Sequence, residues 1–413
     1  MNMEINNSSA PDHEMSDAAK RQISRQTIFI SGIVSIVLGF ASFITGVILN
    51  NSWKGEQINV FSSPGTVWVI IGTVLMVLGI ALAISGGSRM TFTAFLMRYN
   101  AIIILILLFA VSTVISPIFF SGRNLFTLLR QQVPYLVVGM GMMMVIITGG
   151  IDLSACSVAA VSSVITAYSM LNWGLSGGGI NTWAAIALGI GVGAAFGAVN
   201  GLLVAGLRMP AFIVTLAMMF AGEGIAFMIT MGNTVMLDPL SVGRNSLVNF
   251  AMGTTIFGIP YLVVLALVII IIFFFIMKFT TFGRMVYAVG SNETAVKLAG
   301  INSRKYLFFV YLLAGILCGA AGVIVTARSG NASALTARSD YHMSTIAGVV
   351  IGGASLSGGE GTVVMTVVGI FVIALIGNIM SLMNVPSYPQ MVIKAMVIIL
   401  AVLLKSVSSK KRA

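Results

Sequence analysis

The sequence predicts an all-α membrane protein, a polytopic bundle of transmembrane helices, and two observations support that prediction. Apolar residues make up 58% of the 413 residues and charged residues only 8%, which is more hydrocarbon than a soluble domain of this size can bury. The apolar runs are also unbroken, as in Ala101–Ile115 and Leu262–Met277, whereas a transmembrane β-barrel alternates apolar and polar residues along each strand. The spanning elements are therefore expected to be helices.

About twelve apolar segments approach the roughly 20 residues that a helix needs to cross a bilayer. In chain order they are Ile28–Leu49, Thr66–Ile84, Asn100–Ile115, Val133–Thr148, Ser154–Leu171, Thr182–Gly206, Ala211–Thr230, Pro260–Met277, Tyr306–Thr326, Met343–Leu356, Thr362–Met383 and Tyr388–Leu404. Of these, Val133–Thr148, Ser154–Leu171 and Met343–Leu356 are the weakest candidates for complete spans. The expected regions are a disordered cytoplasmic tail at 1–27, two N-terminal helices at 28–92, a main transmembrane domain at 93–405 and a basic cytoplasmic tail at 406–413.

The distribution of basic residues predicts the orientation. With the N-terminus inside, cytoplasmic segments hold 15 of the 22 lysines and arginines and outer segments hold six, while Lys394 falls inside the last span. Cytoplasmic loops of membrane proteins carry such an excess, so both termini are expected in the cytoplasm. The net charge of +11 then has an ordinary explanation and does not indicate a nucleic-acid partner.

Glycines recur at small-residue spacing in two of the expected spans. They are Gly189, Gly191, Gly193 and Gly197 in one span, and Gly315, Gly319 and Gly322 in the other. Small residues let the backbones of two helices approach closely. In lipid the hydrophobic effect does not drive helices together, so van der Waals packing at such close contacts holds them. The pattern therefore predicts close helix packing rather than ligand binding.

One short pattern, GGxxLS, occurs twice, at 149–154 and at 352–357, each time where two apolar segments are interrupted. Breaks at matching places in two halves of a transporter mark the translocation pathway. A chance match in a chain rich in glycine, serine and leucine is the alternative. The residues assigned to these breaks are Gly149, Gly150, Asp152, Ser154, Gly352, Gly353, Ser355 and Ser357.

Charged side chains within or beside the spans are few, and each needs a partner, water or a proton. Asp152 precedes an apolar helix start, so it either caps that helix or contacts substrate, and the cap is favoured. Glu223 lies in mid-span and must face the bundle interior or a cavity. Glu360 is expected near the cytoplasmic surface. Lys394 is either a counter-ion within the membrane or a side chain that extends to the interface.

The residues for enzymatic chemistry are missing from the sequence. It has only two histidines, His13 and His342, and two cysteines, Cys156 and Cys318, which predicts neither a metal site nor a His-centred triad. No GxxxxGK[ST] phosphate loop occurs. We therefore expect no cofactor, no metal and no ATP hydrolysis by this chain, so that energy comes from a partner or from an ion gradient.

A basic, amphipathic segment at Thr280–Lys305 interrupts the apolar spans and contains a short predicted helix. Ser291 or Asn292 can cap the start of that helix, Glu293 suits its first turn, and Gly300 can end it. Its apolar residues, expected to form one face, are Ala295, Val296, Leu298 and Ala299. Such a helix either inserts into a cleft of a soluble partner or lies on the lipid headgroups.

From about Arg98 onward the chain resembles the ribose-type sugar permeases of bacterial ABC importers. The resemblance rests on ITGGIDLS at 147–154, AFIVTL at 211–216, TFGR at 281–284 through AGIN at 299–302, and AGVVIGGASLSGG at 347–359. It implies a multi-pass permease domain in the bacterial cytoplasmic membrane that pairs with a second copy or a paralogue. It also implies a separate ATP-binding subunit on the cytoplasmic side, an extracytoplasmic solute-binding protein and a simple sugar as the solute.

In this resemblance Glu293–Gly300 corresponds to the coupling helix that inserts into the ATPase subunit. The residues assigned to coupling are Gly283, Arg284, Asn292, Glu293, Ala295, Lys297 and Gly300. Three features depart from the family pattern: the two extra N-terminal spans, Glu223 in place of a usual arginine, and the sequence SACS at 154–157 in place of SVGS. The alternatives are a nucleoside or branched-chain amino acid permease, or an ion-coupled carrier that uses Asp152, Glu223 and Lys394.

Overall fold

The computed structural model describes residues 100–116, 118–172, 181–238, 242–256, 258–339 and 341–410. The two N-terminal spans, the tail at 1–27 and the end of the basic tail lie outside these residues. Nearly all of the described chain belongs to one unit, Leu96–Phe119 with Arg123–Ala413. Among the described residues, six helices are long and apolar enough to cross a membrane, so the chain is an all-α polytopic membrane protein.

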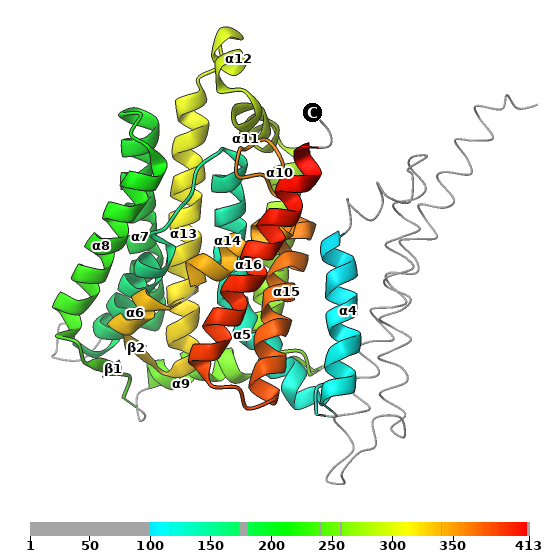
Figure 1. Ribbon diagram of the computed structural model, residues 1–413. Coiled ribbons are helices and arrows are strands. Elements are labelled where there is room, and N and C mark those ends of the chain that lie inside the picture. The colour runs from blue at the N-terminus through cyan, green and yellow to red at the C-terminus, as the bar shows by residue number, and fades with distance from the viewer. Residues whose placement is uncertain are drawn as a thin grey trace, which may run out of the picture. The chain divides into compact units, whose positions relative to one another are not determined.

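The long helices follow one another in alternating directions along the bundle (Figure 1). The first group is α4 (Asn100–Ile115), α5 (Gly122–Ile147), α6 (Ala155–Asn172), α7 (Thr182–Gly201), the π-helix η1 (Leu202–Gly206), α8 (Ala211–Thr230), strand β1 (Thr234–Met236), α9 (Val242–Met252) and α10 (Tyr261–Phe279). The second group is α11 (Thr281–Ser291), α12 (Glu293–Leu298), α13 (Ser303–Ser329), strand β2 (Asn331–Ser333), the 3-10 helix η2 (Ala334–Arg338), α14 (Tyr341–Ile351), α15 (Val363–Leu382) and α16 (Ser387–Lys410).

Several predicted segments agree closely with the helices, and two do not. The segments Asn100–Ile115 and Ala211–Thr230 coincide with α4 and α8. Helix α5 begins at Gly122 rather than at Val133, because the helix continues through a polar stretch that lowers the hydropathy before the apolar run starts. The predicted span at Met343–Leu356 is wrong: α14 has 11 residues, too few to cross a bilayer, and ends at the Gly352–Gly353 turn.

Helices α7 and α13 pack closely through their glycines. A Cβ on Gly193 would lie 2.6 Å from the Cα of Gly319, and one on Gly197 would lie 2.9 Å from the Cα of Gly315. Both distances are shorter than real Cβ contacts, so this crossing requires glycine and confirms the packing prediction. Gly191 differs, because, apart from its chain neighbours and the nearby backbone of its own helix, no atom lies within 4 Å of its Cβ position.

Helix α5 forms the centre of the unit. The side chains of Met143, Met144 and Ile146 are fully buried, and 83% of the apolar window of α5 is buried within the protein. Gly141 of α5 lies against Ala314 of α13, with 2.8 Å between its Cβ position and the Ala314 Cα. The end of this central helix at Ile147 connects the core directly to the loop that follows.

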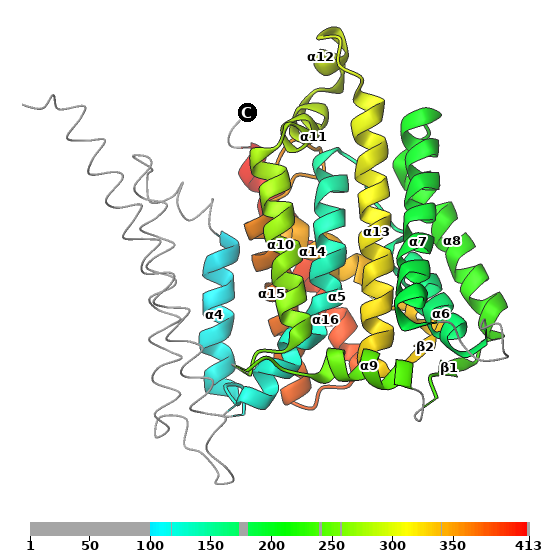
Figure 2. The ribbon, with the colours of Figure 1, turned by 180° about the vertical axis from the view of Figure 1, so that it is seen from behind.

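The two ends of the bundle differ in structure. Helices α11 and α12 project at one end, where α16 also finishes, whereas α9 and the β1–β2 pair lie at the other end (Figures 1 and 2). Strands β1 and β2 are antiparallel three-residue strands and pair Val235 with Ala332. The all-α prediction did not include these two short strands. The end with α12, referred to below as the α12 end, carries Arg208, Lys278, Arg284, Lys297, Arg304 and Lys305.

Candidate functional site

The projecting segment begins with α11, which the sequence did not predict as a helix. Thr280 caps it: the Thr280 hydroxyl accepts a hydrogen bond from the Gly283 N–H at 3.2 Å. Gly283 is buried, and its Cβ position lies 2.5 Å from the Ile276 carbonyl oxygen and closer still to that of Met277. Glycine therefore lets α11 start directly against the end of α10, which indicates a packing role for Gly283. The assigned Arg284 beside it is exposed.

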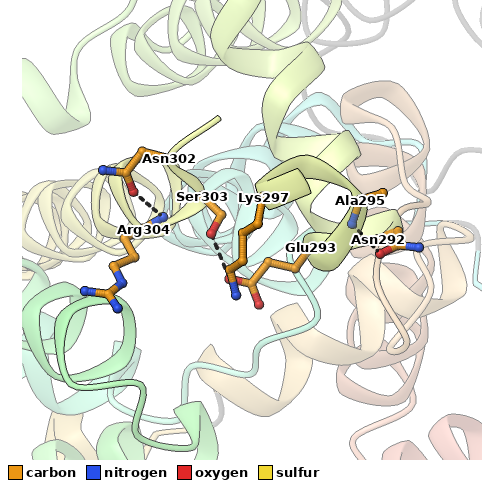
Figure 3. Close-up of polar contacts among 7 residues, drawn as sticks. All are labelled: Asn292, Glu293, Ala295, Lys297, Asn302, Ser303 and Arg304. Carbon is orange, nitrogen blue, oxygen red and sulfur yellow. Dashed lines mark hydrogen bonds and ion pairs between the residues drawn. The ribbon is translucent and has the colours of Figure 1, made fainter. Parts of the chain in front are cut away.

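Helix α12 is defined by its capping contacts, of which Figure 3 shows the hydrogen bond between Asn292 and Ala295. Of the two candidate caps, Asn292 is the one used, since its side-chain oxygen accepts the Ala295 N–H at 2.9 Å. Gly300 has a φ of 77°, a left-handed conformation that favours glycine, and its N–H donates to the Lys297 carbonyl at 3.0 Å. The short helix predicted from these signals is thus present as Glu293–Leu298.

Glu293 holds α12 to the start of α13. Its carboxylate lies 2.7 Å from the Lys297 ammonium and accepts a hydrogen bond from the Ser303 hydroxyl at 2.8 Å (Figure 3). The hydrogen bond from Lys297 is the main reason that the pKa of Glu293 lies below its usual value, and it outweighs partial burial. Glu293 is therefore ionised at neutral pH and braces the short helix, rather than pointing freely into solvent.

The apolar residues of α12 do not form a single face, contrary to the prediction. Val296 is 7% exposed and turns inward, whereas Leu298 is 85% exposed. Ala295, Lys297 and Ala299 are also exposed. A fixed short helix that presents an exposed leucine between small and basic residues has a surface suited to a cleft in another protein.

Both GGxxLS segments form breaks between helices, and they meet at the α12 end. Gly149 and Gly353 have positive φ values of 78° and 94°. In the second loop, the Gly359 N–H donates to the Ile147 carbonyl at 2.8 Å, at the end of α5. Gly290 of α11 completes the junction, because its Cβ position lies 2.9 Å from the Gly359 nitrogen and in closer contact with the Ile147 carbonyl. Helix α11, α5 and the second loop thus touch backbone to backbone.

The remaining residues assigned to the breaks shape the two loops. Gly150 and Gly352 are buried, and a Cβ on either would clash with the Tyr311 hydroxyl or the Met365 carbonyl, respectively. The Ser357 N–H donates to the Ser355 hydroxyl oxygen at 3.3 Å and so tightens the second turn. These contacts account for the glycine and serine pattern as packing and turn formation.

Asp152 contacts Ser154, the residue directly before α6. It is 3% exposed, and its carboxylate accepts hydrogen bonds from the Ser154 N–H at 2.8 Å and from the Ser154 hydroxyl at 2.6 Å. The Asn200 side chain of α7 donates to the same hydroxyl oxygen at 3.0 Å. The contacts of Asp152 are thus structural, but they go to the residue before α6 and not to the N–H groups of the helix itself, so the predicted helix cap is not formed among the described residues.

Glu223 has a partner that the sequence did not reveal. Its carboxylate lies 2.6 Å from the Arg338 Nε, and the Arg338 guanidinium lies 5.1 Å from the centre of the Phe227 ring. The pair connects α8 to η2 at the end opposite α12. No local pattern links positions so distant in the chain, and only the tertiary fold brings them together.

Reversing the charge of Glu223 is expected to destabilise the protein more than neutralising that charge. Glu223→Arg places two cations together, so the melting temperature of the purified protein should fall, whereas Glu223→Gln should change it little because exposed pairs contribute about 0–1 kcal/mol. Combining Glu223→Arg with Arg338→Glu should recover most of the loss. Thermal unfolding in detergent measures all three, and a double variant no better than Glu223→Arg would show that the pair is not coupled.

The three charges required by an ion-coupled carrier are not gathered in one place. Asp152 is bound to Ser154, and Glu223 is paired with Arg338. Lys394 lines a polar cavity between α5, α15 and α16, and neither Asp152 nor Glu223 is among the residues that line it. The described residues therefore contain no shared site of the kind that this alternative needs.

Comparison with known proteins identifies the family. The family described as "Branched-chain amino acid transport system / permease component" matches residues 124–402. The ribose import permease protein RbsC of Escherichia coli K12 is 37% identical over 330 residues, which is 79% of this chain and 98% of that protein. RbsC of Bacillus subtilis is 36% identical over 319 residues, 77% of this chain and 95% of that protein.

A third relative, the D-allose transport system permease protein AlsC of Escherichia coli K12, is 32% identical over 321 residues, 77% of this chain and 94% of that protein. No solved structure matches the chain. The family match runs from the start of α5 into α16, and so includes α12 and both GGxxLS loops. The chain therefore belongs to the family of transport-system permease components that includes the ribose import permeases.

Proposed function

We propose that this chain is the membrane-spanning permease subunit of a bacterial ABC importer for a simple sugar. The names of its relatives, which import ribose and D-allose, support the solute class. The observation that carries the mechanism is the braced, exposed α12, whose neighbour α11 touches the end of the central helix α5. A separate ATP-binding subunit would receive α12, and an extracytoplasmic binding protein would deliver the sugar at the opposite end.

We also propose the finer topology of about twelve crossings with both termini in the cytoplasm, in which the crossing near Met343–Leu356 is completed by the short α14 and the loop after it instead of by a full-length helix. The basic residues at the α12 end support placing that end in the cytoplasm. The regions are then a cytoplasmic tail at 1–27, two additional helices at 28–92, the permease domain at 93–405 and a basic tail at 406–413. A second copy or a paralogue of the chain would complete the pore in the bacterial cytoplasmic membrane.

Transport then proceeds by alternating access. ATP-driven closure of the partner subunits moves α12 and α11, and the backbone contacts at Gly290 pass that movement to α5 and to the loop at Gly359. The assigned coupling residues on α12 fall into two groups. Glu293, Asn292 and Gly300 fix the shape of α12, while Ala295 and Lys297 lie on its exposed surface.

Reconstitution tests this proposal. The tagged chain is purified from its native membrane with the subunits that accompany it, the partners are identified by mass spectrometry, and all components are placed in proteoliposomes. We expect uptake of ribose or a similar monosaccharide that requires ATP, the ATPase subunit and the binding protein. Accumulation by the purified chain alone, driven by a sodium or proton gradient, would overturn it.

Branched-chain amino acids are a second candidate solute because the description of the matching family names them. The same proteoliposomes distinguish the two candidates when leucine and ribose are offered together with the captured binding protein. ATP-dependent uptake of leucine without ribose uptake would replace the sugar proposal while leaving the ABC mechanism intact.

A further inference from the structure

A cavity of about 220 Å³ lies at the α12 end of the bundle. Glu293 of α12 lines it, together with Arg304 and Leu307 from the first turns of α13. Arg208 and Met209, which connect η1 to α8, line the same cavity. About 10–15 Å³ of such space holds one water molecule, so this cavity has room for several. Charged side chains from two distant parts of the chain therefore share one cavity.

Arg208 occupies a fixed turn between α7 and α8. Its φ is 57°, in the left-handed region that glycine adopts far more readily than arginine. The Met209 N–H donates to the Leu203 carbonyl at 3.2 Å and closes the helix end around Arg208, and Pro210 follows directly with its φ restricted by the ring. Arg208 is exposed, so burial of its side chain does not explain an arginine where glycine suits the backbone better. The unfavourable backbone conformation points to a role for the charge.

The positive charge of Arg208 acts on the carboxylate of Glu293. The hydrogen bond from Lys297 is the main reason that the pKa of Glu293 is low, and the charges of Lys297 and Arg208 add to its effect. Lys297 belongs to α12 itself, so its ion pair with Glu293 at 2.7 Å stabilises that helix internally. Arg208 belongs to a different hairpin and does not come within ion-pair distance of Glu293. It therefore attracts Glu293 across the cavity without direct contact.

Helix α12 depends on contacts with its surroundings. It has six residues, too few for a helix to be stable by itself. The Ser303 hydroxyl holds Glu293 to the start of α13, and α11 connects α12 to the end of α5. The attraction between Arg208 and Glu293 adds a link from the same carboxylate to the turn that precedes α8.

We propose that Arg208 is a positioning residue for α12, which ties the carboxylate of Glu293 to the α7–α8 turn across this cavity. When α12 moves toward the turn, the cavity narrows and the two side chains approach each other; when α12 moves away, their attraction weakens with distance. The inference rests on the proposed ABC function. It adds a second route, through α8, by which movement of α12 reaches the membrane spans.

Neutralising the two arginines of the cavity separately tests the tie. In the reconstituted complex, Arg208→Gln is expected to lower the number of sugar molecules taken up per ATP hydrolysed by about threefold, within the range that exposed charge pairs produce. Arg208→Lys keeps the charge and should retain the wild-type ratio. The matched control is Arg304→Gln, because Arg304 lines the same cavity but is not among the charges that lower the pKa of Glu293. Its ratio should equal that of the wild type.

Arg208→Gly separates the charge from the backbone. Glycine suits a φ of 57°, so the melting temperature of this variant should not fall, whereas its uptake per ATP should fall as in Arg208→Gln. Loss of folded complex lowers uptake and stimulated ATP hydrolysis together, so their ratio reports coupling rather than stability. A variant that is as stable as the wild type but transports less sugar per ATP is not expected if Arg208 is merely structural.

A double-mutant cycle identifies the partner of Arg208. If Arg208 acts through Glu293, adding Arg208→Gln to Glu293→Gln should lower the ratio no further. A wild-type ratio in Arg208→Gln, an equal loss in Arg304→Gln, or additive losses in the double variant overturns the tie and leaves the proposed function standing. A wild-type complex that shows no ATP-driven sugar uptake overturns the proposed function itself.

Discussion

Gly193→Leu is expected to prevent the protein from accumulating in folded form. The Gly193 Cβ position lies 2.6 Å from the Cα of Gly319, and its closest neighbour is the carbonyl oxygen of Gly315. Both are backbone atoms, so a change of side-chain rotamer cannot relieve the strain. The free energy of unfolding should therefore fall by at least the roughly 1–3 kcal/mol that is typical of overpacking. Fluorescence-detected size exclusion of a tagged variant measures the effect as loss of the monodisperse peak.

Gly191→Leu is the matched control. It lies on the same helix, and its Cβ position has no neighbouring atom within 4 Å. Leucine is also the better helix former by nearly 1 kcal/mol, so this variant should elute as the wild type does and melt at the same or a higher temperature. Equal behaviour of the two variants would contradict the close α7–α13 crossing described above.

Leu298→Asp should strongly weaken capture of the ATPase subunit while leaving the permease folded. Leu298 is 85% exposed on α12, so the substitution costs little within this chain, but a leucine buried in a partner cleft contributes about 1.5–3 kcal/mol. Affinity should therefore fall by about ten- to a hundredfold. Co-purification of the ATPase subunit with the tagged permease, together with ATP-driven sugar uptake, measures the loss.

The control for this variant is Leu335→Asp. Leu335 is 57% exposed in η2, at the opposite end of the bundle, and its substitution should leave ATPase capture unchanged. If Leu298→Asp also leaves capture unchanged, α12 does not enter the ATPase subunit, and the alternative that it rests on lipid headgroups gains support. The melting temperature of each variant separates loss of docking from loss of folding.

Local signals predicted a large part of the fold. Apolar length located α4 and α8 to the residue, and the cap signals of Asn292 and Gly300 located α12, because spans and caps depend on residues close together in sequence. Helix α11 was missed, since its amphipathic sequence lies inside a basic segment and its start depends on contact between Gly283 and the end of α10. The length of α14 was overestimated, because the length of an apolar run does not reveal that the helix ends at a turn containing Gly353.

The candidate site was only partly predictable for the same reason. The GGxxLS pattern indicated two breaks, but nothing in it showed that both meet at the end of α5 or that Gly290 joins them. The pairing of Glu223 with Arg338 and the cavity shared by Arg208 and Glu293 depend on segments far apart in the chain. No motif around Arg208 reveals this cavity, because Arg208 by itself looks like an ordinary basic residue at a membrane boundary.

The junction at Gly290 has a mechanical consequence. Side chains at most helix contacts can change rotamer and so absorb a small displacement, but here α11 rests on the Ile147 carbonyl with no side chain between them. In the proposed mechanism, a movement of α12 and α11 is therefore passed to α5 with little loss, because the contact is made by backbone atoms. Adding a methyl group at this one position, as in Gly290→Ala, would force α11 and α5 apart and should therefore impair ATP-driven transport if the proposed coupling is correct.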